Sequence, residues 1–178
     1  MIPRPGMITL ASALFGAGAV LVAQTDAYRS PRETLPLSVE PQPVAFSHRM
    51  HAGEAELECV LCHTGVDQGD FAEIVPAGEC MVCHEQIAAD SPEVKKVRAA
   101  AESGEPIPWV PVYRVPGIVF FSHKEHLAAG EECATCHGPV EMRDVLQQEV
   151  STNMTACLDC HRDRGAPVGC TLCHVLGH

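Results

Sequence analysis

Hydrophobic residues form one long uninterrupted run at the beginning of the chain, and beyond it they are scattered among prolines, glycines and charged residues. The run extends over residues 7–23, which are 17 positions without a charge. Fourteen glycines and 14 prolines spread through the sequence argue against long helices and against a regular sheet. Ser91 followed by Pro92 is typical of a helix start, and helix-forming residues continue to Gly104. The pattern therefore predicts a mainly helical fold with a large irregular content.

The apolar run at 7–23 is typical of an export signal or a membrane anchor. A secretory signal has an apolar region of roughly 7–15 residues, whereas a spanning helix needs roughly 17–25. Arg4 precedes the run, and the best small-x-small cleavage candidate, Thr25 to Ala27, is a weak one. Run length and this weak site favour an uncleaved N-terminal anchor over a cleaved signal, with residues 1–27 forming the segment. In either case the rest of the chain works outside the cytoplasm, where cysteines are oxidised or modified.

Two proline-rich stretches are predicted to connect other parts of the chain. Four prolines make residues 28–45 a linker between the N-terminal segment and a domain at 46–178. Four more prolines between 106 and 116 alternate with Trp109, Tyr113 and valines, a density that favours an extended strap over a central strand.

The composition is unusual for a globular protein of 178 residues. Only 4% of the residues are aromatic, while ten are cysteine and ten are histidine. Something other than an aromatic core must therefore organise the fold. The formal charge of −11 repels phosphate backbones, so we expect no nucleic-acid partner.

Every cysteine belongs to a pentapeptide of the form C-x-x-C-H. These are CVLCH from Cys59, CMVCH from Cys80, CATCH from Cys133, CLDCH from Cys157 and CTLCH from Cys170. The pattern is the attachment signal for c-type haem, in which two thiols add to the haem vinyl groups and the next histidine ligates the iron. Residues three apart on a helical turn share a face, so both sulfurs reach one porphyrin edge. Zinc sites and disulfides also use paired cysteines, but neither requires a histidine after every second cysteine.

The motifs predict five covalently bound haem c groups, which would supply the apolar core that the side chains lack. The cysteines predicted to attach them are Cys59, Cys62, Cys80, Cys83, Cys133, Cys136, Cys157, Cys160, Cys170 and Cys173. The predicted proximal ligands of the irons are His63, His84, His137, His161 and His174. We expect Trp109 to cover a haem face or edge, because packing is the usual role of a buried aromatic ring.

A duplicated segment supplies four further histidines. FSHRMH at 46–51 and FSHKEH at 121–126 each precede an attachment motif, and a second motif follows. The chain thus holds two repeats, 46–84 and 121–161, and an extra haem site at 170–174. A six-coordinate haem iron needs a second axial ligand, usually His or Met. The histidines predicted to supply it are His48, His51, His123 and His126.

Distances along the chain suggest how these ligands are shared. The shorter reach assigns His48 to the Cys59 haem and His123 to the Cys133 haem, so the other histidine of each segment reaches a neighbouring haem. Two residues compete for the fifth iron. His178 lies four residues beyond His174 and would serve another haem or none, while Met154 would raise the potential of its haem or pack against a haem edge. An open fifth position is the third alternative.

The order of these motifs resembles the multihaem class III cytochromes c. The resemblance rests on QPVAFSHRMH, CVLCH, CMVCH, IPWVPVYRVPGIVFFSHKEH, CATCHGPVEM and NMTACLDCHR, and it extends over about residues 28–164. In arrangement the chain is most similar to the pentahaem subunit of alternative complex III, a bacterial membrane quinol-oxidising complex. The resemblance implies an electron carrier on the periplasmic side, often held by one N-terminal helix, that exchanges electrons with redox protein partners. The closely following fifth motif departs from that pattern.

The sequence therefore favours electron transfer through five haems, mostly with two histidine ligands, between a membrane quinol-oxidising complex and a downstream acceptor. No substrate chemistry is required. The alternative is a multihaem reductase, which needs an open iron position beside acid or base groups. The ligand tally leaves at most one such position, and this favours the carrier over the enzyme.

Overall fold

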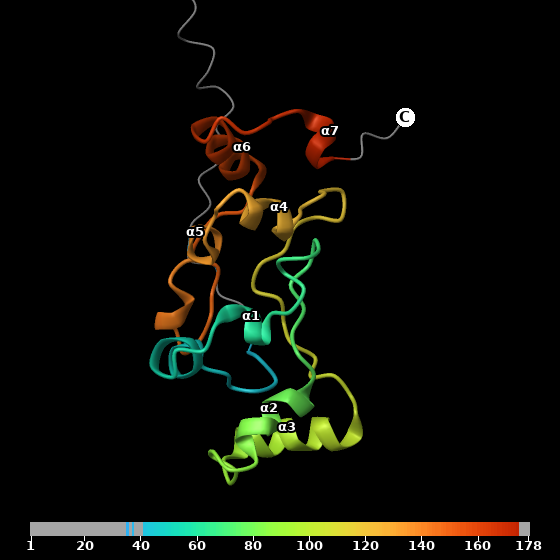
Figure 1. Ribbon diagram of the computed structural model, residues 1–178, viewed down its shortest axis with the longest axis vertical. Coiled ribbons are helices and arrows are strands. Elements are labelled where there is room, and N and C mark those ends of the chain that lie inside the picture. Colours follow the sequence, from blue (N-terminus) through green and yellow to red (C-terminus); the bar gives the residue numbers. More distant parts are fainter. Residues whose placement is uncertain (1–34, 36, 38–40, 175–178) are drawn as a thin grey trace, which may run out of the picture. The chain divides into compact units, whose positions relative to one another are not determined.

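Helices form at each pair of cysteines. The computed structural model describes residues 35, 37 and 41–174, all of which lie within the unit Glu33–His178. The helices that carry the cysteine motifs are α1 (Cys59–Cys62), α2 (Ala77–His84), α5 (Cys133–His137), α6 (Met154–Asp163) and α7 (Cys170–Cys173). The expectation that both cysteines of a motif lie on one helical turn is confirmed (Figure 1).

The two FSHxxH segments also coil. The first forms a π-helical turn, η1 (Arg49–Glu54), in which the backbone N–H of Ala55 donates to the carbonyl of Met50, five residues back. The second forms α4 (His123–Ala128). A short 3-10 turn, η2 (Val140–Met142), packs against η1 and so links the first repeat to the second. Both histidine pairs are therefore held on short helical turns.

The predicted helix after Ser91 is confirmed as α3 (Pro92–Ser103). The Ser91 side chain accepts a hydrogen bond from the Glu93 N–H, and Pro92 occupies the first turn. Gly104 ends the helix with a φ of 72°, a left-handed conformation that glycine adopts without strain. Helix α3 packs beside α2 (Figure 1). The mainly helical, irregular fold expected from the pattern is confirmed.

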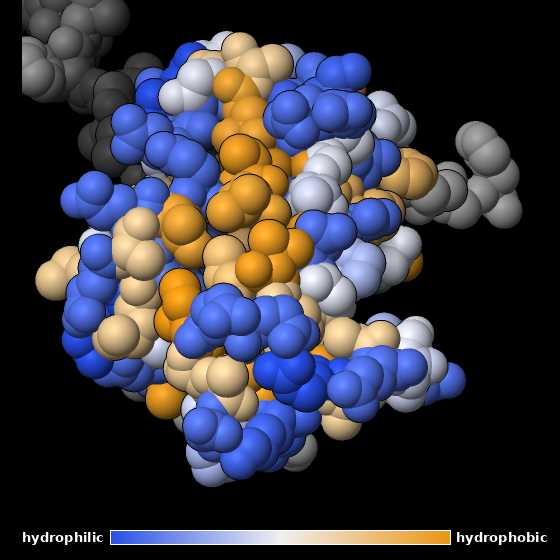
Figure 2. All heavy atoms as spheres, turned by 60° about the horizontal axis from the view of Figure 1, so that its bottom comes forward, coloured by the Kyte–Doolittle hydropathy of each residue, from blue (hydrophilic) through white to orange (hydrophobic). Residues whose placement is uncertain are grey.

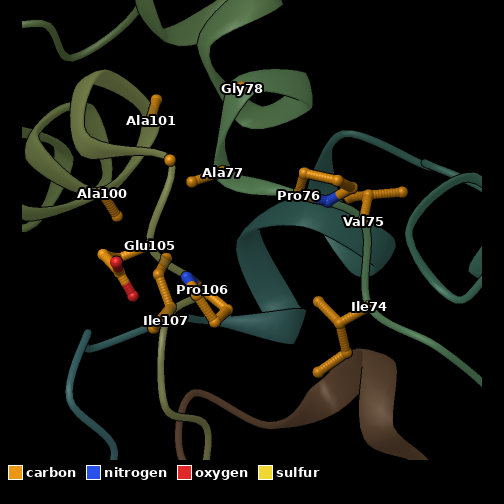
Figure 3. Close-up of a pocket in the computed structure, with 11 residues that line it drawn as sticks. Ile74, Val75, Pro76, Ala77, Gly78, Ala100, Ala101, Glu105, Pro106 and Ile107 are labelled. Atoms are coloured by element: carbon orange, nitrogen blue, oxygen red, sulfur yellow. The ribbon is translucent and has the colours of Figure 1, made fainter.

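A small hydrophobic cluster lies where α2 meets α3. Its buried members are Val44, Ala77, Met81, Val94 and Val97. Trp109 packs against this cluster, and its ring meets Phe46 edge-on with the centroids 6.3 Å apart. A cavity of about 440 Å³ borders the cluster, and Figure 3 shows how the start of α2, the end of α3 and the strap that follows converge around it. As expected, residues 105–116 contain neither helix nor strand.

Five buried hydrophobic residues in the described part are few for a chain of this length. In the described part, 17 large hydrophobic side chains are exposed, including Phe71, Val82 and Val145, each at 75% or more. Figure 2 shows apolar residues gathered in a band across one face, with polar residues on both sides. Such exposed area is uncommon in a soluble monomer and indicates that something else covers it.

Within the described ranges, the remaining secondary structure consists of two isolated antiparallel bridges, Leu37 with Gln148 and Val119 with His174. The segment 1–27, predicted to be an anchor or signal, lies outside the described residues. Among the residues that are described, no helix is long and apolar enough to cross a membrane.

Candidate haem-binding sites

Four predicted proximal histidines each face a histidine of an FSHxxH segment. His48 faces His63 with the ring centroids 6.3 Å apart, and His123 faces His137 at 6.4 Å. The same arrangement recurs at the second motif of each repeat. His51 faces His84, and His126 faces His161, both with centroids 5.9 Å apart.

These separations fit one metal ion between each pair of rings. Metal bonds to imidazole nitrogen are about 2 Å long, and each nitrogen lies roughly 1 Å from its ring centre, so an axially bridged pair has centroids about 6 Å apart. Direct contact between two stacked rings would be closer. The angle between the rings is 5° for His48 and His63 and 12° for His123 and His137. At the second motifs it is 59° and 46°. The two repeats are thus alike in both spacing and tilt.

Backbone carbonyls hold most of these rings in one tautomer. The Nδ1–H group of His51 donates to the carbonyl oxygen of Ser47, and that of His126 donates to the carbonyl oxygen of Ser122. His123 donates in the same way to Asp70, and all three distances are 2.7–2.8 Å. The rings of His84, His161 and His174 do the same towards Ile87, Pro167 and Ile118. With Nδ1 protonated, Nε2 carries the free lone pair that an iron requires.

The phenylalanine of each FSHxxH segment contacts both of its histidines. Phe46 stacks on His51 at 4.3 Å and meets His48 edge-on at 4.9 Å. Phe121 stacks on His126 at 4.7 Å and meets His123 edge-on at 4.8 Å. The sequence analysis left these two phenylalanines without a role, although their repetition in register with the histidines was the available signal.

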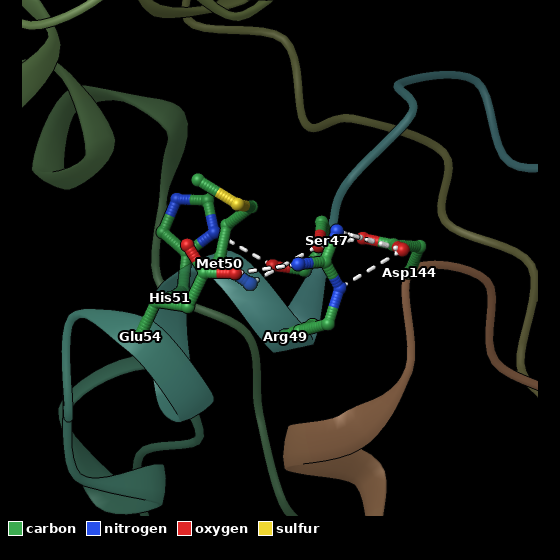
Figure 4. Close-up of polar contacts among 6 residues, drawn as sticks. All are labelled: Ser47, Arg49, Met50, His51, Glu54 and Asp144. Carbon is green, nitrogen blue, oxygen red and sulfur yellow. Dashed lines mark hydrogen bonds and ion pairs between the residues drawn. The ribbon is translucent and has the colours of Figure 1, made fainter.

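A polar network fixes the first segment. Figure 4 shows Asp144 accepting hydrogen bonds from the Ser47 hydroxyl at 2.6 Å and from Arg49 at 3.0 Å, while Arg49 also pairs with Glu54. The hydrogen bond from Ser47, and then that from Arg49, lowers the pKa of Asp144. Asp144 belongs to the second repeat, so this network joins the two repeats beside the rings of His48 and His51.

Tyr113 supports a proximal histidine from the strap. Its ring meets His137 edge-on at 4.7 Å, and its hydroxyl donates to the His137 carbonyl oxygen at 3.2 Å. The same hydroxyl oxygen accepts a hydrogen bond from the Glu149 N–H at 3.1 Å. Sequence reasoning placed Tyr113 in the strap without a contact to any predicted ligand.

Burial favours neutral imidazoles at the first motifs. Desolvation, followed by the proximity of His63 and His51, lowers the pKa of His48 to about 4. Desolvation is also the largest cause of the lowered pKa of His63 and of His137. A neutral ring is the form that ligates a metal ion, so burial and ligation require the same protonation state.

The ten cysteines are free thiols, and none is more than partly covered. Burial, and then neighbouring thiols, raises the pKa of Cys80, Cys136 and Cys157. No group of three or more His, Cys, Asp or Glu side chains gathers around one point in the described residues. A haem iron takes only two protein ligands, so the facing rings and the free thiols beside them fit haem c.

The fifth site differs from the other four. His174 anchors its ring on Ile118, but no imidazole ring among the described residues faces it. Met154, the first residue of α6, is 56% exposed. His178, the other predicted candidate, lies outside the described residues.

Two families of cytochromes c match the chain. Residues 23–107 match the class III cytochrome c family, and residues 119–175 match the family of cytochrome c7 and related cytochromes c. The first match includes FSHRMH and two attachment motifs, and the second includes FSHKEH and the other three. Both matches are to cytochromes c, and together they extend over most of the described residues.

One relative of the chain has a described role. It is the multihaem cytochrome c subunit of menaquinone reductase from Nitratidesulfovibrio vulgaris strain Hildenborough, which is 35% identical over 101 residues. The alignment extends over 56% of this chain and 47% of the relative, so the chain spans about half the length of the relative.

Proposed function

We propose that this chain is an electron-transfer subunit that binds five haem c groups through its five C-x-x-C-H motifs. The observation that carries the proposal is the set of four facing imidazole pairs, each spaced for one iron and each beside a pair of free thiols. When bound, haem c supplies a one-electron iron couple whose potential depends on its axial ligands and burial.

The protein's own contribution is to hold these ligands. In the proposed assignment His48 and His63 share one iron, and His51 and His84 share the next. His123 with His137 and His126 with His161 form the corresponding pairs of the second repeat. Carbonyl groups fix the tautomers, and the two phenylalanines keep the rings in place, so little reorganisation is needed when the iron changes charge.

The proposed partner is a membrane complex that converts quinones, with the haem domain on the periplasmic side. The acidic charge of −11 suits a basic docking surface on a soluble redox partner. The motif order resembles that of a subunit of a quinol-oxidising complex, whereas the relative is named as a subunit of a menaquinone reductase. Both complexes convert quinones. The apolar run at 7–23 is proposed to anchor the chain.

Intact-mass measurement of protein made in a host that attaches haem tests the haem count. We expect the apoprotein mass plus five haems, and Cys80→Ala combined with Cys83→Ala should remove one. A colourless product from such a host, or a count other than five, would refute the assignment. Reduction of the haems by a quinol, compared with their oxidation by a quinone in membranes that contain the complex, tests the direction of flow.

A reductase with one open iron remains the second candidate, because no imidazole among the described residues faces His174. Carbon monoxide binding to the reduced protein and a high-spin signal in the oxidised protein would support it. Entirely low-spin spectra would support the electron carrier, and they would indicate that the iron at the Cys170 site also has a second axial ligand.

A further inference from the structure

Each FSHxxH segment bridges two haem sites of the proposed function. The imidazoles of His48 and His51 stand on one turn and face His63 and His84, so the Cys59 and Cys80 sites are neighbours. The thiol of Cys80 also interacts with Cys62. His123 and His126 face His137 and His161 in the same way, which makes the Cys133 and Cys157 sites neighbours.

The two repeats meet at equivalent residues. Cys59 and Cys133 are each the first cysteine of the first motif in their repeat, and the two thiols are near one another, because burial and then the proximity of Cys133 raise the pKa of Cys59. His63 interacts with His123 and with His137 across the same junction. A backbone hydrogen bond also joins the two repeats, since the Lys124 N–H donates to the Gly69 carbonyl at 3.1 Å. The repeats therefore meet with their first motifs next to each other.

The fifth site joins the far end of the second repeat. Cys157 interacts with Cys173, while Phe120 N–H donates to the carbonyl of Cys173 at 2.8 Å. Val119 forms a bridge with His174. Helix α7 is thereby held against the strand-like residues that lead into FSHKEH.

We infer that the five haem sites form one unbranched row in the order Cys80, Cys59, Cys133, Cys157, Cys170. The inference rests on the proposed function. The row differs from the order of the motifs along the chain, because the Cys80 site precedes the Cys59 site in the row. The Cys80 and Cys170 sites have one neighbour each, and the other three have two. Electrons therefore exchange with other molecules at these two ends.

The number of neighbours is measurable by magnetic coupling in the haem-loaded protein. His48→Met, His51→Met and His126→Met each replace an imidazole by a thioether, which raises the potential of that haem so that it is reduced first. A reduced low-spin iron is diamagnetic, and its neighbours then lose their coupling to it. Paramagnetic resonance during a potentiometric titration should show two altered ferric signals in H48M and H126M, and one in H51M.

Two signals altered in H51M, or one in H48M, would overturn the order while leaving five haems in place. A mass below five haems in the wild-type protein would refute the proposed function and the row with it. Removal of the last site by Cys170→Ala with Cys173→Ala supplies a second measurement. In that background H126M should alter one signal instead of two, and H48M should still alter two. Unchanged coupling in H126M would exclude Cys170 as the end of the row.

Discussion

Glu56 is held in a left-handed backbone conformation, and its counterpart in the other repeat is a glycine, which adopts such a conformation without strain. The φ of Glu56 is 54°, in the left-handed region, and the residue three positions before the first cysteine of the second repeat is Gly130, with a φ of 87°. In each repeat the residue after this position donates its backbone N–H to a carbonyl of the FSHxxH segment. Leu57 donates to His51 at 3.0 Å, and Glu131 donates to His126 at 3.1 Å. This turn brings the cysteines back towards the histidines.

Glu56→Gly is therefore expected to stabilise the protein. A side chain in the left-handed region costs roughly 1–2 kcal/mol. The added freedom of glycine in the unfolded chain offsets about 0.4–1 kcal/mol of this. The net gain is about 0.5–1 kcal/mol, which corresponds to roughly 1–4 °C in Tm for a domain of this size.

Thermal unfolding of the haem-loaded protein, followed by circular dichroism, measures the change. Glu58→Gly is the matched control, because it removes the same side chain and charge at a φ of −62°, where glycine relieves nothing. Gly130→Glu should lower Tm, since it introduces the same strain into the second repeat. If E56G is no more stable than E58G, the turn does not store the strain inferred from its φ angle.

Three further predictions follow from the contacts of the first repeat and from the charge. Phe46→Leu removes the ring contacts with His48 and His51, each worth about 0.5–1.5 kcal/mol, and the more distant one with Trp109. It should shift the low-spin signals of the Cys59 and Cys80 sites only, and Phe121→Leu should shift those of the second repeat. A uniform change in both variants would contradict a positioning role. Hydrogen bonds from Ser47 and Arg49 lower the pKa of Asp144, so the stabilisation by this carboxylate is present above the ordinary carboxyl pKa of about 4 and is lost as the pH falls through the lower folded value. Asp144→Asn should therefore flatten the dependence of Tm on acid pH. An equally steep curve in D144N would exclude this carboxylate as the cause of the dependence. Electron exchange with a basic redox partner should slow as ionic strength rises, whereas salt-independent rates would rule out electrostatic docking.

Much of this architecture is encoded locally and was predictable. The spacing of two cysteines followed by histidine defines one helical turn, and Ser91, Pro92 and Gly104 define α3 at both ends. The pairing of His48 with the Cys59 motif followed from short reach along the chain, and the rings of His48 and His63 do face each other. Iron ligation by these rings stays a prediction.

The parts that escaped prediction depend on contacts between distant residues. Nothing near Cys59 in the sequence indicates that its thiol lies near Cys133, because that proximity arises only when the two repeats meet. Tyr113 reaches His137 across 24 positions, and Asp144 reaches Ser47 across 97. Neither the strap nor the turn around Asp144 has a periodic pattern that would predict these partners.

The scarcity of buried side chains has a consequence for how the molecule is made. With Val44, Ala77, Met81, Val94 and Val97 as the buried hydrophobic residues of the described part, the polypeptide gains little from collapsing alone. Attachment of the cofactors must then drive folding, and a molecule that misses one ring keeps a loosened, cleavable stretch. Proteases would cleave such incomplete molecules first, so that quality control is built into the fold itself.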